Sequence, residues 1–153
     1  MTRSTLTMFS AALLTSMAVA QQPAPATATA AMSASAPAAV RAEVYVIAPK
    51  DGAHVHSPVT VRFGLKGLGI APAGVKFDNT GHHHLLVDTD IKDVKLDAPL
   101  PATDKILHFG KGQTETELKL APGKHTLQLL FADYLHVPLQ PITTSKKITI
   151  TVD

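Results

Sequence analysis

The sequence PVTVRFGLK, residues 58–66, alternates large apolar side chains with polar or small ones, and it decides the fold more clearly than any other stretch. Apolar residues stand at every second position from Val59 to Leu65, while Thr60, Arg62 and Lys66 stand between or after them. Successive side chains of a β-strand point to opposite faces, so this period of two is typical of a half-buried strand. The stretch therefore predicts a strand with one face on a hydrophobic core.

Six other segments also read as strands bounded by Gly, Pro and Asp turns. They are residues 43–48, 82–88, 105–109, 113–120, 124–132 and 148–152. Residues 67–81, 89–104 and 133–144 are Pro-containing connections, and we find no amphipathic helix and no internal repeat. Seven short strands in about 110 residues predict an all-β, immunoglobulin-like antiparallel sandwich.

The region before the first strand has two parts. Residues 1–20 combine Arg3, a short apolar stretch and the small-x-small pattern of Ala18-Val19-Ala20, which is typical of a secretory signal cleaved near Ala20. Residues 21–40 are mostly Ala, Pro, Thr and Ser, and we expect a disordered tether. The domain then occupies residues 41–153 and is periplasmic or secreted, with no transmembrane segment in the mature chain.

Charge and sulfur content exclude several classes of function. Of the 14 Lys and Arg side chains, Arg3 belongs to the leader, and 12 Asp and Glu side chains nearly balance the rest. This balance argues against nucleic acid as a partner, because phosphate binding relies on clustered basic charge. The chain has no cysteine, and its four methionines all precede residue 41. Disulfides and thiolate metal sites are therefore excluded from the domain, and soft Cu(I) sites and blue-copper sites are disfavoured.

Three consecutive histidines, His82, His83 and His84, begin the strand predicted at residues 82–88. Imidazole is a common ligand for borderline metals and titrates near neutral pH, so the run suggests metal binding or proton sensing. Alternation aligns His83 with Leu85, which predicts that His83 packs in the core, and makes His82 and His84 a possible chelating pair. Leu86 lies on the same face as His82 and His84, so that face could instead be the one that points into the core, with His83 pointing outward.

The strand order predicts which other residues join the histidine run. In an up-and-down succession of strands, every second connection lies at the same end of the sandwich. His108, which closes the strand at 105–109, and Asp133 and His136, which follow residues 124–132, should therefore lie near His82 and His84. Asp133 could bind a metal, orient a histidine or simply form a turn. An additional strand at residues 92–96 would move every later connection to the opposite end of the sandwich.

The remaining histidines are assigned to the opposite end of the sandwich. His54 and His56 lie in a turn, where exposure to solvent is the favoured interpretation. His125 follows Ala121-Pro122-Gly123-Lys124 and stands where immunoglobulin-like domains often have a tyrosine that hydrogen-bonds to the preceding corner. We expect His125 to replace that tyrosine.

Several separated motifs resemble the bacterial family of domain of unknown function 4399. They are IAPAG at residues 70–74, GHHHLL at 81–86, HFGKGQTE at 108–115 and PGKHTLQL at 122–129. The resemblance covers roughly residues 44–152 and implies a small secreted or periplasmic domain without an assigned function. Members of the family often carry a second histidine at the position of Leu139, which this chain lacks.

A more distant resemblance is to periplasmic copper-resistance proteins of sandwich fold, in which an Asp and a His after the sixth strand help to bind Cu(II). Asp133 and His136 are similarly placed, with looser spacing. This resemblance implies a possible copper site and supplies an analogy only.

The leading hypothesis is a non-enzymatic periplasmic domain that binds Cu(II) or Zn(II) for buffering, delivery or tolerance. Its candidate ligands are His82, His84, His108 and His136, with Asp133 and His83 as further candidates. The alternative is a structural or interaction module of the cell envelope, with an unidentified protein partner, whose histidines form a polar cluster that responds to pH. An enzyme is less favoured, because no nucleophile motif of the Gly-x-Ser-x-Gly type is evident and because Glu115 and Glu117 lie on a strand without an evident relation to the histidines.

Overall fold

A computed structural model describes residues 41–153, so the predicted signal and tether at 1–20 and 21–40 lie outside the described residues. The described part contains nine strands and one short 3-10 helix. The strands are β1 (Glu43–Ala48), β2 (His54–Val55), β3 (Val59–Lys66), β4 (Gly69–Ile70), β5 (Thr80–Val87), β6 (Ile106–His108), β7 (Glu115–Leu118), β8 (Gly123–Ala132) and β9 (Ile148–Val152), and the helix is η1 (Ile91–Asp93). Among these residues no helix is long and apolar enough to cross a membrane.

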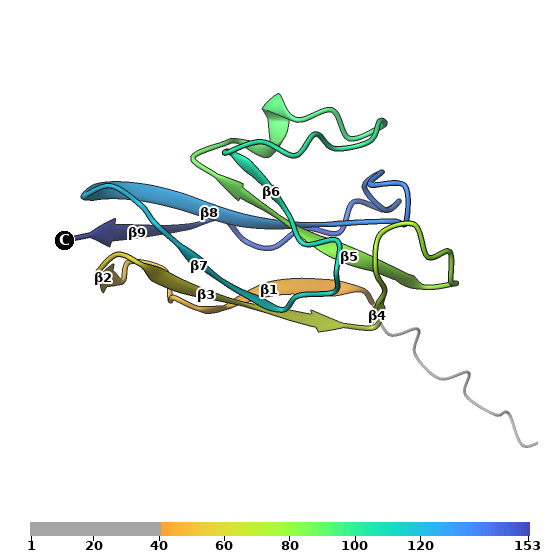
Figure 1. Cartoon of the computed structure of the whole chain (residues 1–153), viewed down its shortest axis with the longest axis horizontal. Coiled ribbons are helices and arrows are strands. Elements are labelled where there is room, and N and C mark those ends of the chain that lie inside the picture. Colours follow the sequence, from red (N-terminus) through yellow and green to blue (C-terminus); the bar gives the residue numbers. More distant parts are fainter. Residues whose placement is uncertain (1–40) are drawn as a thin grey trace, which may run out of the picture. The chain divides into compact units, whose positions relative to one another are not determined.

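Two sheets pack as the sandwich that the sequence predicts (Figure 1). The smaller sheet has the order β1-β3-β7 and is antiparallel throughout. The larger sheet has the order β2-β9-β8-β5-β4, and β6 also pairs with β5. All seven predicted strands are present, and the two additional strands, β2 and β4, each contribute two residues in parallel pairings with β9 and β5. The sheet is therefore mixed at these two short pairings and antiparallel elsewhere.

The main hydrophobic core lies between the two sheets. From the smaller sheet, Val59, Val61 and Phe63 are buried, as the alternation of residues 58–66 predicts. From the larger sheet, Leu85 and Leu129 are fully buried against them. Apolar burial is the dominant favourable term in folding, so this interior holds the sheets together.

A second, smaller core covers the opposite face of the larger sheet. Leu86 and Leu130 point to this face and pack with Leu100 and Ile106. The connection between β5 and β6, which includes η1, lies over the larger sheet on the side away from β1 and β3 (Figure 1). Asp90 accepts a hydrogen bond from the Lys92 amide at the start of η1. No full strand forms at residues 92–96, so this segment does not change the end of the sandwich at which the later connections are predicted to lie.

The central strand β5 is consequently buried on both faces. Every residue from Gly81 to Val87 is buried, although three of these seven residues are histidines. Close pairing requires Gly81, because a Cβ atom at this position would lie 2.2 Å from the carbonyl oxygen of Ala132 on β8. The histidine run is therefore an interior feature rather than an open rim.

Candidate metal site

Strand β5 separates the three consecutive histidines into two environments. His83 points into the main core, where its ring lies 5.2 Å from that of Phe63 and 5.1 Å from that of Phe131, measured between centroids. This placement confirms the prediction that His83 packs with Leu85 in the core. His82 and His84 point to the other face of β5, and their ring centroids lie 4.9 Å apart. His83, also named as a candidate ligand, thus lies on the opposite side of the strand from this pair.

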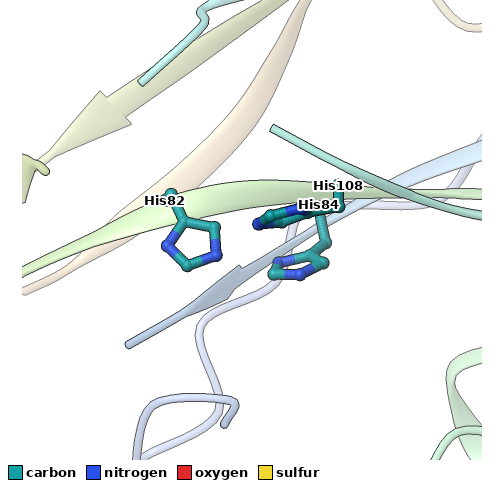
Figure 2. A group of neighbouring side chains, drawn as sticks. All are labelled: His82, His84 and His108. Carbon is teal, nitrogen blue, oxygen red and sulfur yellow. The ribbon is translucent and has the colours of Figure 1, made fainter. Parts of the chain in front are cut away.

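Strand β6 brings His108 to the same face. His84 pairs directly with His108 in the antiparallel register of β5 and β6. Figure 2 shows the rings of His82, His84 and His108 gathered on one side of β5. Gly110 makes room for this arrangement, because a Cβ atom there would lie 2.3 Å from Nε2 of His108.

The loop after β8 brings His136 to the group. The ring centroid of His136 lies 4.6 Å from that of His108 and 5.1 Å from that of His82. Its φ angle is 67°, a left-handed conformation that is uncommon for a residue with a side chain. Such a conformation persists only where surrounding contacts hold it.

Asp133 supplies several of those contacts. Its Oδ1 atom accepts hydrogen bonds from the backbone N–H groups of Leu135 at 2.8 Å and Val137 at 2.9 Å. The Asp133 carbonyl accepts from the His136 N–H at 3.0 Å, and the His136 carbonyl accepts from the Leu100 N–H at 2.9 Å. Asp133 therefore forms the turn that presents His136, which agrees with its turn-forming interpretation.

His82, His84 and His108 form a group that could hold a metal ion. One ring nitrogen from each lies within 4.8 Å of the others. His82 and His84 are fully buried, and His108 is partly buried. Five of their nitrogens are buried without a hydrogen-bond partner in the described residues, namely both nitrogens of His82, both of His84 and Nε2 of His108. Buried polar atoms are nearly always paired, so this set requires an explanation.

Burial also keeps these imidazoles neutral. Loss of hydration lowers the pKa of His82 to about 4 and that of His84 to about 3, and neighbouring histidines contribute to both shifts. The pKa of His108 is lowered for the same two reasons. The charge of Asp133 acts in the opposite direction on the pKa of His82 without cancelling the effect of burial. Neutral imidazole is the form that binds metal, so these residues are competent ligands at neutral pH.

The other three histidines lie away from this group. His54 is exposed, and its Nδ1 atom lies 3.2 Å from a carboxylate oxygen of Asp153. His56 is also exposed. His125 pairs through Nδ1 with Asp88 at 2.7 Å, and its Nε2 atom lies 2.9 Å from the carbonyl oxygen of Ala121. The bond to Ala121 confirms that His125 replaces the corner tyrosine.

Two glycines that support the group were not identified as functional from the sequence. In the sequence, Gly81 ends the connection at residues 67–81 and Gly110 follows the strand at 105–109, and both occur in motifs of the family resemblance. The signal that could have revealed them is their position, since each lies within two residues of a candidate ligand. Their role depends on contacts with His108 and with β8, which a single sequence does not contain.

The chain matches a protein-family model. The model described as "Domain of unknown function (DUF4399)" matches residues 61–153, which span β5, β6, β8 and all four clustered histidines. No curated protein and no solved structure matches the chain.

Proposed function

The chain belongs to the DUF4399 family, and we propose that it is a non-enzymatic periplasmic or secreted domain that binds a borderline metal ion, Cu(II) or Zn(II). His82, His84 and His108 bind the ion, and His136 completes the ligand set. The domain would serve metal buffering, delivery or tolerance. Asp133 holds the loop that carries His136.

The five unpaired ring nitrogens are the observation that carries this proposal. Leaving a buried polar atom without a partner costs about 1–3 kcal/mol, so the group lowers the stability of the metal-free fold by several kcal/mol. A bound ion takes one nitrogen from each ring, so it would convert three of the five nitrogens into ligands and leave the second nitrogen of His82 and of His84 unpaired. Binding energy would then offset the cost of burying them.

The chemistry of the ligands limits the metal. Imidazole suits Zn, Cu, Fe and Ni, whereas Cu(I) and iron–sulfur clusters prefer sulfur. No sulfur atom is present among residues 41–153. The site therefore supports a borderline ion held by nitrogen.

A pH-responsive polar cluster in an envelope module is the competing function. A structural polar network satisfies its members by hydrogen bonds. Within residues 41–153, His82, His84 and His108 make no such bonds through the five nitrogens described above. Both nitrogens of His83 are also unpaired within these residues, although this ring lies in the main core. What favours a metal over a fixed polar network is that the rings of His82, His84 and His108 also converge.

Metal titration of the purified, tag-free protein tests the proposal. We expect Zn(II) and Cu(II) each to bind with a stoichiometry of one, measured by calorimetry, and His84→Ala to abolish that binding. His54→Ala and His56→Ala are matched controls, because these histidines are exposed and lie elsewhere. If binding survives His84→Ala but disappears when His54 and His56 are both replaced by alanine, the assignment of the metal site to His82, His84 and His108 is refuted.

A further inference from the structure

The four clustered imidazoles are arranged around a common point, and this arrangement specifies the kind of ion. Resting on the proposed function, we infer that His82, His84, His108 and His136 form a closed tetrahedral site for Zn²⁺ and not a tetragonal site for Cu(II). All four coordination positions belong to the protein. The site therefore stores or transfers the ion, or stabilises the fold, and does not activate a substrate.

The distances between ring centroids carry the inference. All six pairs fall between 4.6 and 6.1 Å. Four square-planar ligands define four equal edges and two diagonals, and each diagonal is longer than an edge by a factor of about 1.4. Two of the six distances, joining different pairs of rings, would then be long. Only the distance between His84 and His136 is long, at 6.1 Å, and the opposite distance, between His82 and His108, is 4.9 Å. The rings are therefore close to a tetrahedron.

The size of this tetrahedron fits a metal. Its edges average about 5.1 Å, so its centre lies about 3.1 Å from each centroid. A Zn–N bond of about 2.0–2.1 Å plus roughly 1.1 Å from a ring nitrogen to its centroid requires about the same length. The spacing of the four ring centres thus suits a single ion without a change in the strands. His136 does not belong to the group whose nitrogens already lie within 4.8 Å of one another, so its ring must turn toward the ion.

Small ring rotations complete the coordination. In a tetrahedral site the nitrogens lie about 3.4 Å apart. The closest nitrogens of His82, His84 and His108 lie within 4.8 Å of each other. Rotation about the Cβ–Cγ bond changes these nitrogen distances while the ring centre stays nearly fixed, because that bond points close to the centre of the ring.

The preference for zinc follows from coordination chemistry. Zn²⁺ has no geometric preference from its d electrons and is almost always tetrahedral in structural sites with four protein ligands. Cu(II) has the higher intrinsic affinity for nitrogen but prefers a tetragonal arrangement. Strands β5 and β6 determine the positions of three of the rings, so Cu(II) would have to distort paired strands to reach that geometry. Cu(I) tolerates four-coordination but favours sulfur, which the site lacks.

Cobalt substitution tests the geometry in the full-length protein. Co(II) reports coordination by its visible spectrum, since tetrahedral Co(II) absorbs strongly and six-coordinate Co(II) only weakly. We expect strong bands with one equivalent of Co(II), their loss when one equivalent of Zn(II) is added, and at least a tenfold weaker affinity for Zn(II) in His136→Ala. His56→Ala should leave the spectrum and the affinity unchanged. His136→Gln replaces His136→Ala if circular dichroism shows that the alanine variant does not fold.

The outcomes separate this inference from the proposed function. Weak six-coordinate bands, or a tetragonal Cu(II) signal by electron paramagnetic resonance from a protein in which Zn(II) does not compete, would overturn the tetrahedral site and leave metal binding intact. Unchanged Zn(II) affinity in His136→Ala would also overturn it. Failure of Zn(II), Co(II) and Cu(II) to bind at all would overturn both.

Discussion

His84 and His108 face each other across the pairing of β5 and β6, with ring centroids 5.1 Å apart and ring planes 30° from parallel. A strand register fixes backbone positions more firmly than a loop does, so this pair is the rigid half of the candidate site. His136 is the adjustable half, because a loop carries it.

Gly110→Ala should weaken metal binding by at least tenfold. The new Cβ atom would lie 2.3 Å from Cε1 and Nε2 of His108, so the ring must leave its place opposite His84. Calorimetric titration with Zn(II) measures the effect. Lys111→Ala is the matched control at an exposed neighbouring position, and equal affinities of the two variants would contradict the role assigned to Gly110.

Asp133→Ala should lower both the free energy of unfolding and the affinity for Zn(II), whereas Asp133→Asn should keep most of both. Asparagine retains an oxygen that can accept from Leu135 and Val137, but it removes the carboxylate charge. The loss of two hydrogen bonds in the alanine variant should cost about 1–3 kcal/mol of unfolding free energy. Denaturant unfolding and Zn(II) titration measure the two effects. If Asp133→Asn binds Zn(II) as poorly as Asp133→Ala, Asp133 is a direct ligand instead of a positioning residue.

Acid should destabilise the metal-free protein through its buried histidines. Burial lowers the pKa of His82 and His83 to about 4 and that of His84 to about 3, whereas the same groups titrate near 6.5 when unfolded. Below pH 6.5 the unfolded chain therefore binds more protons, and stability falls as the pH decreases toward the folded values. Above pH 6.5 these groups contribute no pH dependence. Denaturant midpoints measured between pH 8 and pH 4 should show this decline, and a flat profile would contradict it.

His125 should behave in the opposite way. The hydrogen bond with Asp88, followed by the bond with Ala121, raises the pKa of His125 above 6.5. A raised pKa stabilises the fold below the unfolded value, and this contribution is lost as the pH rises through the folded value. NMR titration of the ring should show the raised pKa, and Asp88→Asn should lower it. A pKa unaffected by Asp88→Asn would show that the pair does not form in solution.

The sequence predicted the sandwich well because period-two alternation reports directly on half-buried strands. It predicted residues 43–48 with the bounds of β1, and it predicted that His108 and His136 would lie near His82 and His84. It could not decide what lies over the face of His82 and His84. The residues of the connection that pack in the second core have irregular spacing, so no periodic pattern reveals them; they are Ile91, Val94, Leu96 and Leu100.

Other features depend on contacts between distant segments. The short strands β2 and β4 exist only because they lie beside β9 and β5, so no local pattern of residues indicates them. The predicted strand at 113–120 is shorter in the structure, as β7, although the Thr114 carbonyl still accepts a hydrogen bond from Phe63. The depth of the histidine group likewise follows from the outer layer of loops.

Zinc should stabilise the protein and protect one end of it selectively. At a free Zn(II) concentration about 100 times the dissociation constant, binding to the folded state alone adds about 2.7 kcal/mol, which should raise the melting temperature by roughly 10 °C. Because His136 joins the loop to the ligands on β5 and β6, amide exchange of Leu135, His136 and Val137 should slow when Zn(II) binds. Amides near His54, at the other end of the sandwich, serve as the internal control and should change only with global stability. Equal protection at both ends would show that Zn(II) stabilises the fold without engaging His136.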